Sequence, residues 1–297
     1  MESTTRIIDG TLYVRSAQPY AFDLRVHALG HGHTEATATP AFAWHEVAQL
    51  EPLAAADYAH QLAEPEPLTE RELLDKAAQN RLRSTRRART KVRRLAKLKG
   101  LTELLTLTYR ENMVDRDRMA RDMDVFLKRV RRVLPHFEYV AVFERQKRGA
   151  WHAHLAVRKV QSHYMNRGTL VKSYDLLRSM WRGVVGSNNG NVDISRNKRV
   201  RRSSAKLAAY LSKYIGKTFD QAEKHVNSYS ASGRDIPSPV LERMLTSNQA
   251  EAIAGLFDML SPDFYAAGEF HQAYIDGGGF YLCLSPPERG KPPLGLQ

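Results

Sequence analysis

The sequence is poor in cysteine and in long apolar runs. Its 297 residues include one cysteine, Cys283, so an intramolecular disulfide is excluded and a zinc site with cysteine ligands is not expected. No stretch approaches the roughly 20 apolar residues that a membrane-spanning helix needs. The first residues lack the basic-then-apolar pattern of a secretory signal. We therefore expect a cytoplasmic protein with no membrane partner.

Acidic residues are outnumbered by basic ones. Lys and Arg total 45 against 32 Asp and Glu, which gives a formal net charge of +13. The excess is clustered, because residues 81–99 hold ten Lys or Arg and residues 196–206 hold six, with no acid in either segment. Clustered cations that neutralise phosphates release condensed counterions. The charge pattern therefore favours a nucleic-acid partner over a protein that is merely basic.

The chain also lacks internal repeats and a GxxxxGK[ST] phosphate-binding loop, so we expect no fused helicase. Its 42% hydrophobic and 26% charged content is typical of a globular protein. Composition shifts and proline-rich boundaries predict four segments. These are an N-terminal segment of unclear role (1–66), a basic helix (67–100), a central domain (101–234) and a C-terminal extension (235–297).

Apolar periodicity predicts an α+β fold. The first basic cluster lies in one amphipathic helix of roughly 69–98, which Thr69 caps and Gly100 ends. The later pattern favours an antiparallel sheet flanked by helices, drawn on one face, with a mainly helical C-terminal extension. The predicted strands are 11–14, 104–109, 137–145, 151–158, 192–195 and 280–284, and the predicted helices are about 119–133, 173–185, 203–217 and one or two around 239–260.

Two histidines alternate with apolar residues in the predicted strand 151–158. His152 and His154 are two residues apart, so their imidazoles project from one face and can bind one divalent ion. Across the predicted hairpin, Glu144 lies opposite either Trp151 or His152, and in the second register it shares the histidines' face. A His-His-Glu set with open positions suits Mn²⁺ or Mg²⁺. Two solvent-facing histidines on an edge strand are the alternative.

Two tyrosines lie four residues apart in the predicted helix 203–217. Tyr210 and Tyr214 therefore share one face, and Lys206, Lys213 and Lys217 lie on or beside it. A nearby cation favours the phenolate and lowers a pKa that starts near 10. A phenolate can attack a phosphodiester and become covalently attached, while a metal polarises the phosphate. A pair of core or rim tyrosines is the alternative.

Taken together, three motifs resemble those of the HUH endonucleases, and specifically the two-tyrosine replication initiators of rolling-circle plasmids and single-stranded-DNA phages. Leu105–Tyr109 resembles the first, mainly structural motif. Trp151–Leu155 resembles the His-hydrophobic-His metal motif, and Tyr210–Tyr214 resembles the nucleophile motif. The resemblance covers about residues 104–217, and the ordered combination is more specific than any one motif.

The resemblance implies that the histidines lie on a central strand and the tyrosines on a nearby helix. It implies nicking of single-stranded or hairpin origin DNA through a 5′-phosphotyrosine, a 3′-hydroxyl that primes the host polymerase, and rejoining. Host helicase and polymerase in a bacterial cytoplasm would be the partners. Lys213 matches a position that contacts the phosphate or assists the nucleophile, whereas the third ligand, Glu144, varies in the family. Tyr210 is the expected initiating nucleophile.

Basic and aromatic residues around these motifs are expected to hold the DNA strand. Aromatic rings can stack on unpaired bases, and Tyr109, Tyr164 and Trp181 are the candidates for that contact. The expected DNA-binding cations are Arg86, Arg87, Arg93 and Arg94 in the long helix, and Arg199, Arg201, Arg202, Lys206 and Lys217 near the tyrosines.

Other functions stay open on the sequence alone. A two-tyrosine transposase would use the same motifs, whereas a conjugative relaxase usually places its tyrosine before the histidines. A non-enzymatic DNA-binding regulator would need the basic helix but neither the metal nor the tyrosines. A metal-dependent nuclease with water as its nucleophile would leave no covalent adduct.

Overall fold

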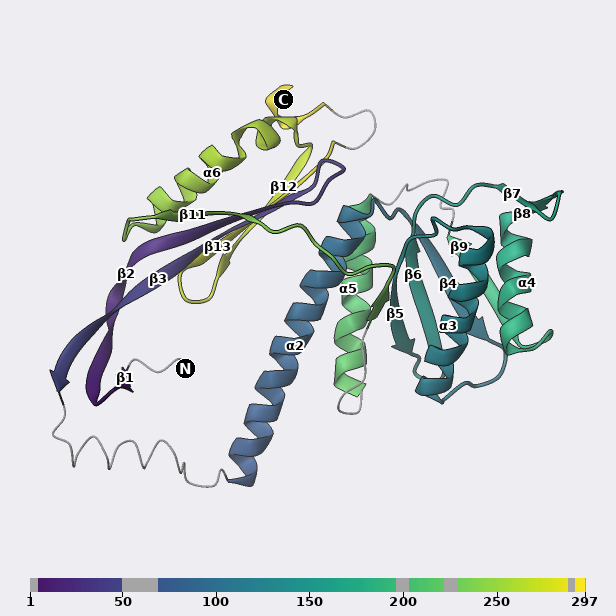
Figure 1. Ribbon diagram of the computed structural model, residues 1–297, viewed down its shortest axis with the longest axis horizontal. Coiled ribbons are helices and arrows are strands. Elements are labelled where there is room, and N and C mark those ends of the chain that lie inside the picture. The colour runs from purple at the N-terminus through teal and green to yellow at the C-terminus, as the bar shows by residue number, and fades with distance from the viewer. Residues whose placement is uncertain (1–4, 50–68, 196–202, 222–228, 288–291, 297) are drawn as a thin grey trace. The chain divides into compact units, whose positions relative to one another are not determined.

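The chain folds into two compact units. The terminal unit comprises residues 1–28, 32–79 and 237–297, and the central unit comprises residues 29–31 and 80–236. The units are described one at a time (Figure 1). The computed structural model of the chain describes residues 5–49, 69–195, 203–221, 229–287 and 292–296.

The central unit is built on a five-stranded antiparallel sheet. Its strand order is β10-β5-β6-β4-β9, so the histidine strand β6 is the middle strand. This arrangement confirms the predicted α+β fold, and the strands that the sequence indicated are present with ends shifted by at most two residues. The strands are β4 (Glu103–Tyr109), β5 (Tyr139–Arg145), β6 (Trp151–Val157), β9 (Gly190–Ser195) and the unpredicted β10 (Tyr229–Ala231).

Helices α3 (Arg116–Val133) and α4 (Ser173–Val185) cover one face of this sheet (Figure 1). The Asp115 carboxylate accepts the Arg118 backbone N–H and caps α3, while the apolar stripe of α3 packs inward. The ring of Trp181 is fully buried at the centre of this core. These two helices therefore lie where the periodicity of the sequence predicts them.

The opposite face is covered by the C-terminal part of α2 (Glu70–Leu98) and by α5 (Ser204–Gln221). Placing helices on one face alone was therefore wrong. The reason lies in β5, where residues 139–143 are buried in succession, so that both faces of the strand are apolar. A strand that is apolar on both faces needs a covering layer on each side. The packed residues on this second face include Val92, Leu95, Val140, Val142, Leu207, Leu211 and Ile215.

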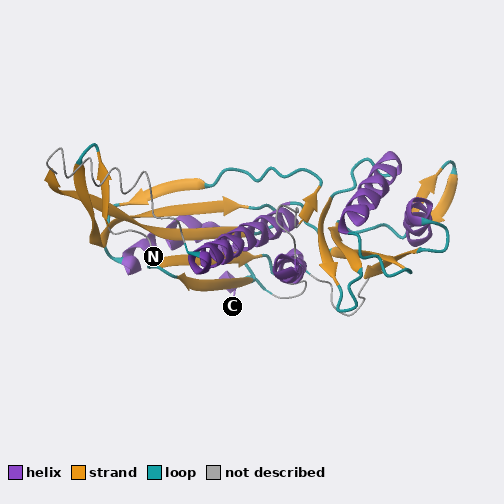
Figure 2. Ribbon diagram, turned by 90° about the horizontal axis from the view of Figure 1, so that it is seen from below, coloured by secondary structure: helices purple, strands orange, loops and turns teal. Residues whose placement is uncertain are grey.

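The terminal unit is a six-stranded antiparallel sheet packed against α6 (Gln249–Ala266). Its order is β1-β2-β3-β13-β12, and β11 pairs with β2. The two longest strands have 18 and 16 residues, and strands are drawn in orange in Figure 2. The strands are β1 (Thr5–Ile8), β2 (Thr11–Ala28), β3 (Thr34–Gln49), β11 (Val240–Met244), β12 (Glu269–Ile275) and β13 (Gly279–Ser285).

Two sequence-based assignments in this unit need correction. The predicted helix around 239–260 begins only at Gln249, because residues 240–244 pair with β2 as strand β11. The predicted strand at 11–14 is only the start of β2. Alternation of apolar and polar residues at 21–27, with Phe22, Leu24 and Val26 buried, was the signal for the longer strand. The C-terminal extension therefore contains one helix and three strands.

The remaining elements are small. The hairpin β7 (His163–Asn166) and β8 (Thr169–Lys172) precedes α4, and a short 3-10 turn, η1 (Leu294–Leu296), follows β13. Among the described residues, no helix has the length and apolarity required to cross a membrane.

Candidate active site

The β5–β6 hairpin brings Glu144 and the two histidines to one face of the sheet. Glu144 lies opposite His152, which is the second of the two registers that the sequence left open. The chain turns at residues 146–149, where the Gln146 N–H donates to the Ala150 carbonyl over 2.8 Å. Gly149 has a φ of +91°, a backbone conformation that glycine adopts without steric cost. The three side chains therefore point the same way from neighbouring strands.

The histidines are buried, with His152 9% and His154 7% exposed. The His154 Nε2 and Glu144 Oε2 atoms are 2.9 Å apart, within hydrogen-bond distance. Nε2 of His152 is also buried but makes no hydrogen bond within the described part of the chain. Burial lowers the pKa of His152 below its ordinary value, and repulsion from a protonated His154 lowers it further. His152 is therefore neutral near pH 7, with a ring nitrogen free to accept a ligand.

Two further side chains hold the other ring nitrogens of the histidines. Thr106 Oγ1 on β4 lies 3.2 Å from Nδ1 of His154, and Gln146 Nε2 lies 3.1 Å from Nδ1 of His152. Hydrogen bonds of this kind fix the orientation and tautomer of a metal-binding imidazole. Neither residue was given this role from the sequence. Only the register that sets Thr106 opposite His154 reveals the first contact.

Helix α5 places both tyrosines against the histidine strand. The ring of Tyr214 stacks on His154 with centroids 4.7 Å apart and planes inclined by 26°, while the Tyr210 ring lies 6.5 Å from the same imidazole. The Tyr214 hydroxyl donates a hydrogen bond of 2.6 Å to the Tyr210 oxygen. Both tyrosines are half-buried at the edge of the apolar cluster that fastens α5 to the sheet. Two sequence motifs about 60 residues apart therefore meet in one site.

The lysines predicted beside the tyrosines are only partly described. Lys206 and Lys213 are exposed on α5, and the Lys206 N–H donates to Ser203 Oγ at the start of the helix. The side chain of Lys217 lies outside the described residues, as do Arg199, Arg201 and Arg202. Their predicted contacts with DNA therefore stay predictions.

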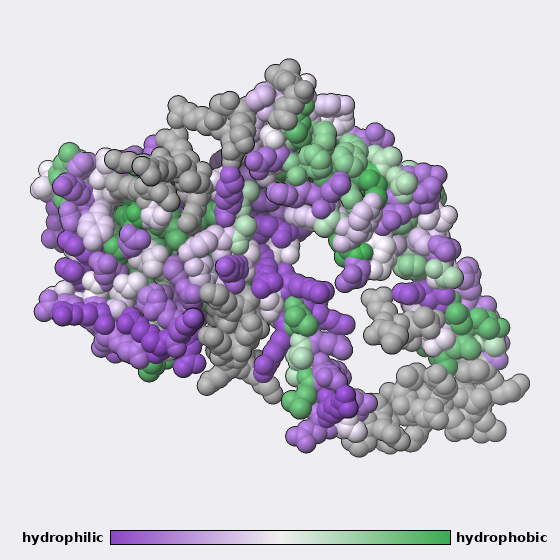
Figure 3. Space-filling model, turned by 180° about the vertical axis from the view of Figure 1, so that it is seen from behind, coloured by the Kyte–Doolittle hydropathy of each residue, from purple (hydrophilic) through white to green (hydrophobic). Residues whose placement is uncertain are grey.

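The cations predicted on the long helix lie on α2. Arg86 and Arg87 are exposed, whereas Arg93 and Arg94 are half-buried. Hydrophilic side chains, coloured purple in Figure 3, gather along this helix. Its apolar stripe at Val92 and Leu95 packs on the sheet. The basic face is thus held on the same side of the sheet as the histidines and tyrosines.

Two of the three aromatic residues predicted to stack on bases are in the core. Tyr109 is 4% exposed and Trp181 is fully buried, and their rings pack edge to face. The Tyr109 hydroxyl donates to Asp122, and Trp181 Nε1 donates to the Thr108 carbonyl. Their prediction as base-stacking residues was wrong, because buried and hydrogen-bonded rings have no face for a base. Tyr164 is half-buried beside the same core, and its proposed stacking stays a prediction.

The donor set around His154 fits a hard divalent ion chemically. Two imidazoles and one carboxylate suit Mn²⁺ or Mg²⁺ when water completes the shell. In the described residues, however, no three His, Cys, Asp or Glu side chains are arranged to hold a metal directly. Glu144 is hydrogen-bonded to His154, so an ion would have to replace this contact. The unpartnered Nε2 of buried His152 is the atom that such an ion would satisfy.

Comparison with known proteins gives one match. Residues 102–219 match the family model of the replication-associated protein ORF2, a family of rolling-circle replication initiators. The matched segment runs from just before β4 into the last turn of α5, and so contains both histidines and both tyrosines. No curated protein and no solved structure matches the chain. The family match supports a role in DNA replication and, with it, contact with DNA.

Proposed function

We propose that the chain is a replication initiator that nicks single-stranded origin DNA through a tyrosine and later rejoins the strand. The observation that carries the proposal is the contact of Tyr210 and Tyr214 with His154 on the central strand. A nucleophile and a phosphate-polarising site must lie within one reacting group of each other for such chemistry. The matched replication family supports the same reading.

In the proposed reaction, the phenolic oxygen of Tyr210 attacks the scissile phosphorus and forms a new P–O bond. The P–O3′ bond breaks, the 3′ oxygen leaves, and the proton lost by the phenol is balanced by the proton gained at the 3′-hydroxyl. The product is a 5′-phosphotyrosine and a free 3′-hydroxyl that can prime a host polymerase. Attack by a 3′-hydroxyl on the phosphotyrosine reverses these bonds and rejoins DNA. The phosphodiester energy is conserved, so no nucleotide cofactor is needed.

The hydrogen bond between the tyrosines supports Tyr210 as the first nucleophile. Tyr214 donates to the Tyr210 oxygen, and a donated hydrogen bond stabilises that oxygen when it becomes negative. After the first cleavage, Tyr214 is placed to attack a second strand while Tyr210 retains the first product. Exposed Lys213 on the same helix would contact the phosphate.

His152, His154 and Glu144 are the residues that would hold a Mn²⁺ or Mg²⁺ ion. When bound, the ion would polarise the scissile phosphate and stabilise its developing charge. Thr106 and Gln146 would keep the two imidazoles oriented through their Nδ1 atoms. Cations on α2, including Arg86, would hold the strand, and the host helicase and polymerase would act on the nicked product.

The test is incubation of the full chain with single-stranded oligonucleotides that tile the candidate origin, with Mn²⁺. Denaturing electrophoresis detects cleavage, and mass analysis locates any nucleotide attached to the protein. We expect an adduct that the double variant Tyr210→Phe/Tyr214→Phe loses. Tyr174→Phe on α4 is the matched control, because it removes a phenolic hydroxyl on a helix of the opposite face.

Each other outcome identifies a different function. Cleavage without an adduct would assign the nucleophile to water and make the protein an ordinary metal-dependent nuclease. DNA binding with neither cleavage nor adduct would make it a non-enzymatic regulator. Cleavage that persists both in a His152→Ala/His154→Ala double variant and in chelator would remove the metal assignment.

A further inference from the structure

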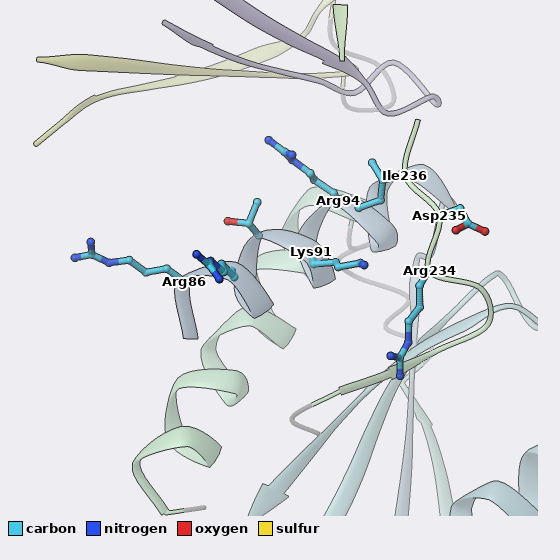
Figure 4. A pocket seen from close by; sticks show the side chains of 8 residues that line it. Arg86, Lys91, Arg94, Arg234, Asp235 and Ile236 are labelled. Carbon is cyan, nitrogen blue, oxygen red and sulfur yellow. The ribbon is translucent and has the colours of Figure 1, made fainter. Parts of the chain in front are cut away.

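An open pocket lies outside the segment that matches the replication family, between α2 and residues 234–236 (Figure 4). Its volume is about 650 Å³. Five of its lining side chains are cationic, and one, Asp235, is a carboxylate. We call it the arginine groove, and its cations are Arg86, Arg87, Lys91 and Arg94 from α2 and Arg234 from the opposite wall.

The opposite wall of the arginine groove is held firmly in place. Strand β10 pairs with β5, and directly after it the Ser232 hydroxyl accepts the Tyr139 N–H over 2.9 Å. Gly233 then turns the chain with a φ of +81°. Ile236 packs against the apolar cluster that also holds α2 and α5 on the sheet. Because both walls are packed into one core, the groove does not have to form when a ligand binds.

The cations of the arginine groove are available to a ligand. In the part of the chain that the structure describes, no carboxylate forms an ion pair with Arg86, Arg87 or Lys91. Figure 4 shows Lys91 extending from α2 toward the other wall, whereas the Asp235 carboxylate points away from α2. The single acid of the lining therefore does not neutralise the groove.

The spacing of the cations favours a polymer over a small anion. Arg87, Lys91 and Arg94 are four and three residues apart, so they form one stripe along α2. At about 1.5 Å per residue, successive cations are separated by about 5 to 6 Å along the helix axis. A ligand that repeats its negative charge along its length can contact several of them at once, whereas one small anion cannot.

We propose that the arginine groove binds the phosphodiester backbone of a DNA strand. The choice of DNA rests on the proposed function, whereas the groove itself does not. The helices α2 and α5 pack in the same cluster on one face of the sheet, so a strand in the groove lies on the face that carries His154 and the tyrosines. Arg234 and Ile236 give this binding site a second wall that the basic helix alone would lack.

The test is a salt titration of DNA binding by the full chain. Fluorescence anisotropy would follow a labelled 30-nucleotide oligo(dT) in EDTA, with both active-site tyrosines replaced by Phe so that no cleavage occurs. The test variant is Arg86→Gln/Lys91→Gln/Arg234→Gln. Each contact with a single strand contributes about 0.7 to the salt slope and about fivefold to affinity at 0.1 M salt. We therefore expect the slope to fall by about 2 and the affinity by about 100-fold.

The control variant is Arg121→Gln/Lys128→Gln/Arg132→Gln on α3, which removes the same charge from the opposite face of the sheet. It should leave the salt slope unchanged. A second variant, Lys91→Arg/Arg234→Lys, keeps the charges and should bind as the parent chain does. An equal loss in the test and control variants would overturn the proposal, because net charge and not the groove would then govern binding. An unchanged slope in the test variant would overturn it as well.

The two proposals can fail separately. In the chain with its tyrosines intact, the groove variant should still form the covalent adduct at saturating DNA, with a raised KM and an unchanged kcat. Loss of DNA affinity in the groove variant, in a chain that forms no adduct, would keep the groove and remove the nicking function. Adduct formation with an unchanged KM would do the reverse.

Discussion

The hydrogen bond between the two tyrosines leads to a quantitative prediction for Tyr214→Phe. The replacement keeps the ring, so its stacking 4.7 Å from the His154 imidazole is preserved. It removes only the hydroxyl that donates to the Tyr210 oxygen over 2.6 Å. A hydrogen bond to a charged group contributes about 1.5 to 3 kcal/mol, and each 1.4 kcal/mol is a factor of ten in rate. Adduct formation by Tyr210 should therefore slow by about 10- to 150-fold.

The assay is the single-turnover rate of adduct formation with excess enzyme, quenched with detergent. Tyr210→Phe should abolish the first adduct, whereas Tyr214→Phe should slow it and leave the attached nucleotide on Tyr210. Ser212→Ala is a control on the same helix, because its hydroxyl donates only to the Ala208 carbonyl. An unchanged rate in Tyr214→Phe would refute the assisting role of the hydrogen bond. An adduct found on Tyr214 in the unmodified chain would reverse the assignment.

Three further predictions concern the metal donors and the first motif. Thr106→Val should lower Mn²⁺ affinity in calorimetric titration by about 10- to 100-fold, because it removes the partner of His154 Nδ1. His152→Ala should abolish nicking but leave oligonucleotide affinity in EDTA nearly unchanged, since phosphate contacts dominate binding. Burial and the Asp122 hydrogen bond raise the pKa of Tyr109, so above about pH 10 the free energy of unfolding should fall by about 1.4 kcal/mol per pH unit from this group.

Each of these predictions has its own control. Thr106→Ser keeps the hydroxyl and should retain metal binding, and equal losses in both variants would indicate a general packing defect. A parallel loss of DNA affinity in His152→Ala would show that the histidine acts in binding. For Tyr109, the sign follows because the unfolded chain ionises this phenol at a pH where the folded chain keeps it neutral. Tyr109→Phe should flatten the alkaline decline in urea unfolding, and an identical decline in both proteins would contradict it.

The elements that periodicity predicts well are those whose pattern is local. The α4 helix has the predicted bounds 173–185, and the buried side of α3 carries the predicted residues Met119, Met123 and Phe126. Likewise, a spacing of two on a strand places His152 and His154 on one face, and a spacing of four on a helix brings Tyr210 and Tyr214 together. In each case the backbone geometry of one element determines the relation.

Long-range pairing was beyond the reach of these patterns. Strands β3 and β12 of the terminal unit were not predicted, because a strand is stabilised by partners that are remote in sequence. The same limit explains the error with Tyr109 and Trp181. Their aromatic character is equally compatible with a base-stacking surface and with a core, and only the packing of α3 and α4 on the sheet decides for the core.

The amino-acid sequence by itself determined the order of the motifs, the face that each pair of residues shares and the clustering of positive charge. Tertiary structure alone decided that Tyr214 stacks on His154, that Thr106 meets its Nδ1 atom, and that Arg234 faces α2. The physical reason is that side-chain direction follows from the period of a single helix or strand. Contacts between elements follow instead from sheet register and from the packing of buried side chains, which involve the whole chain.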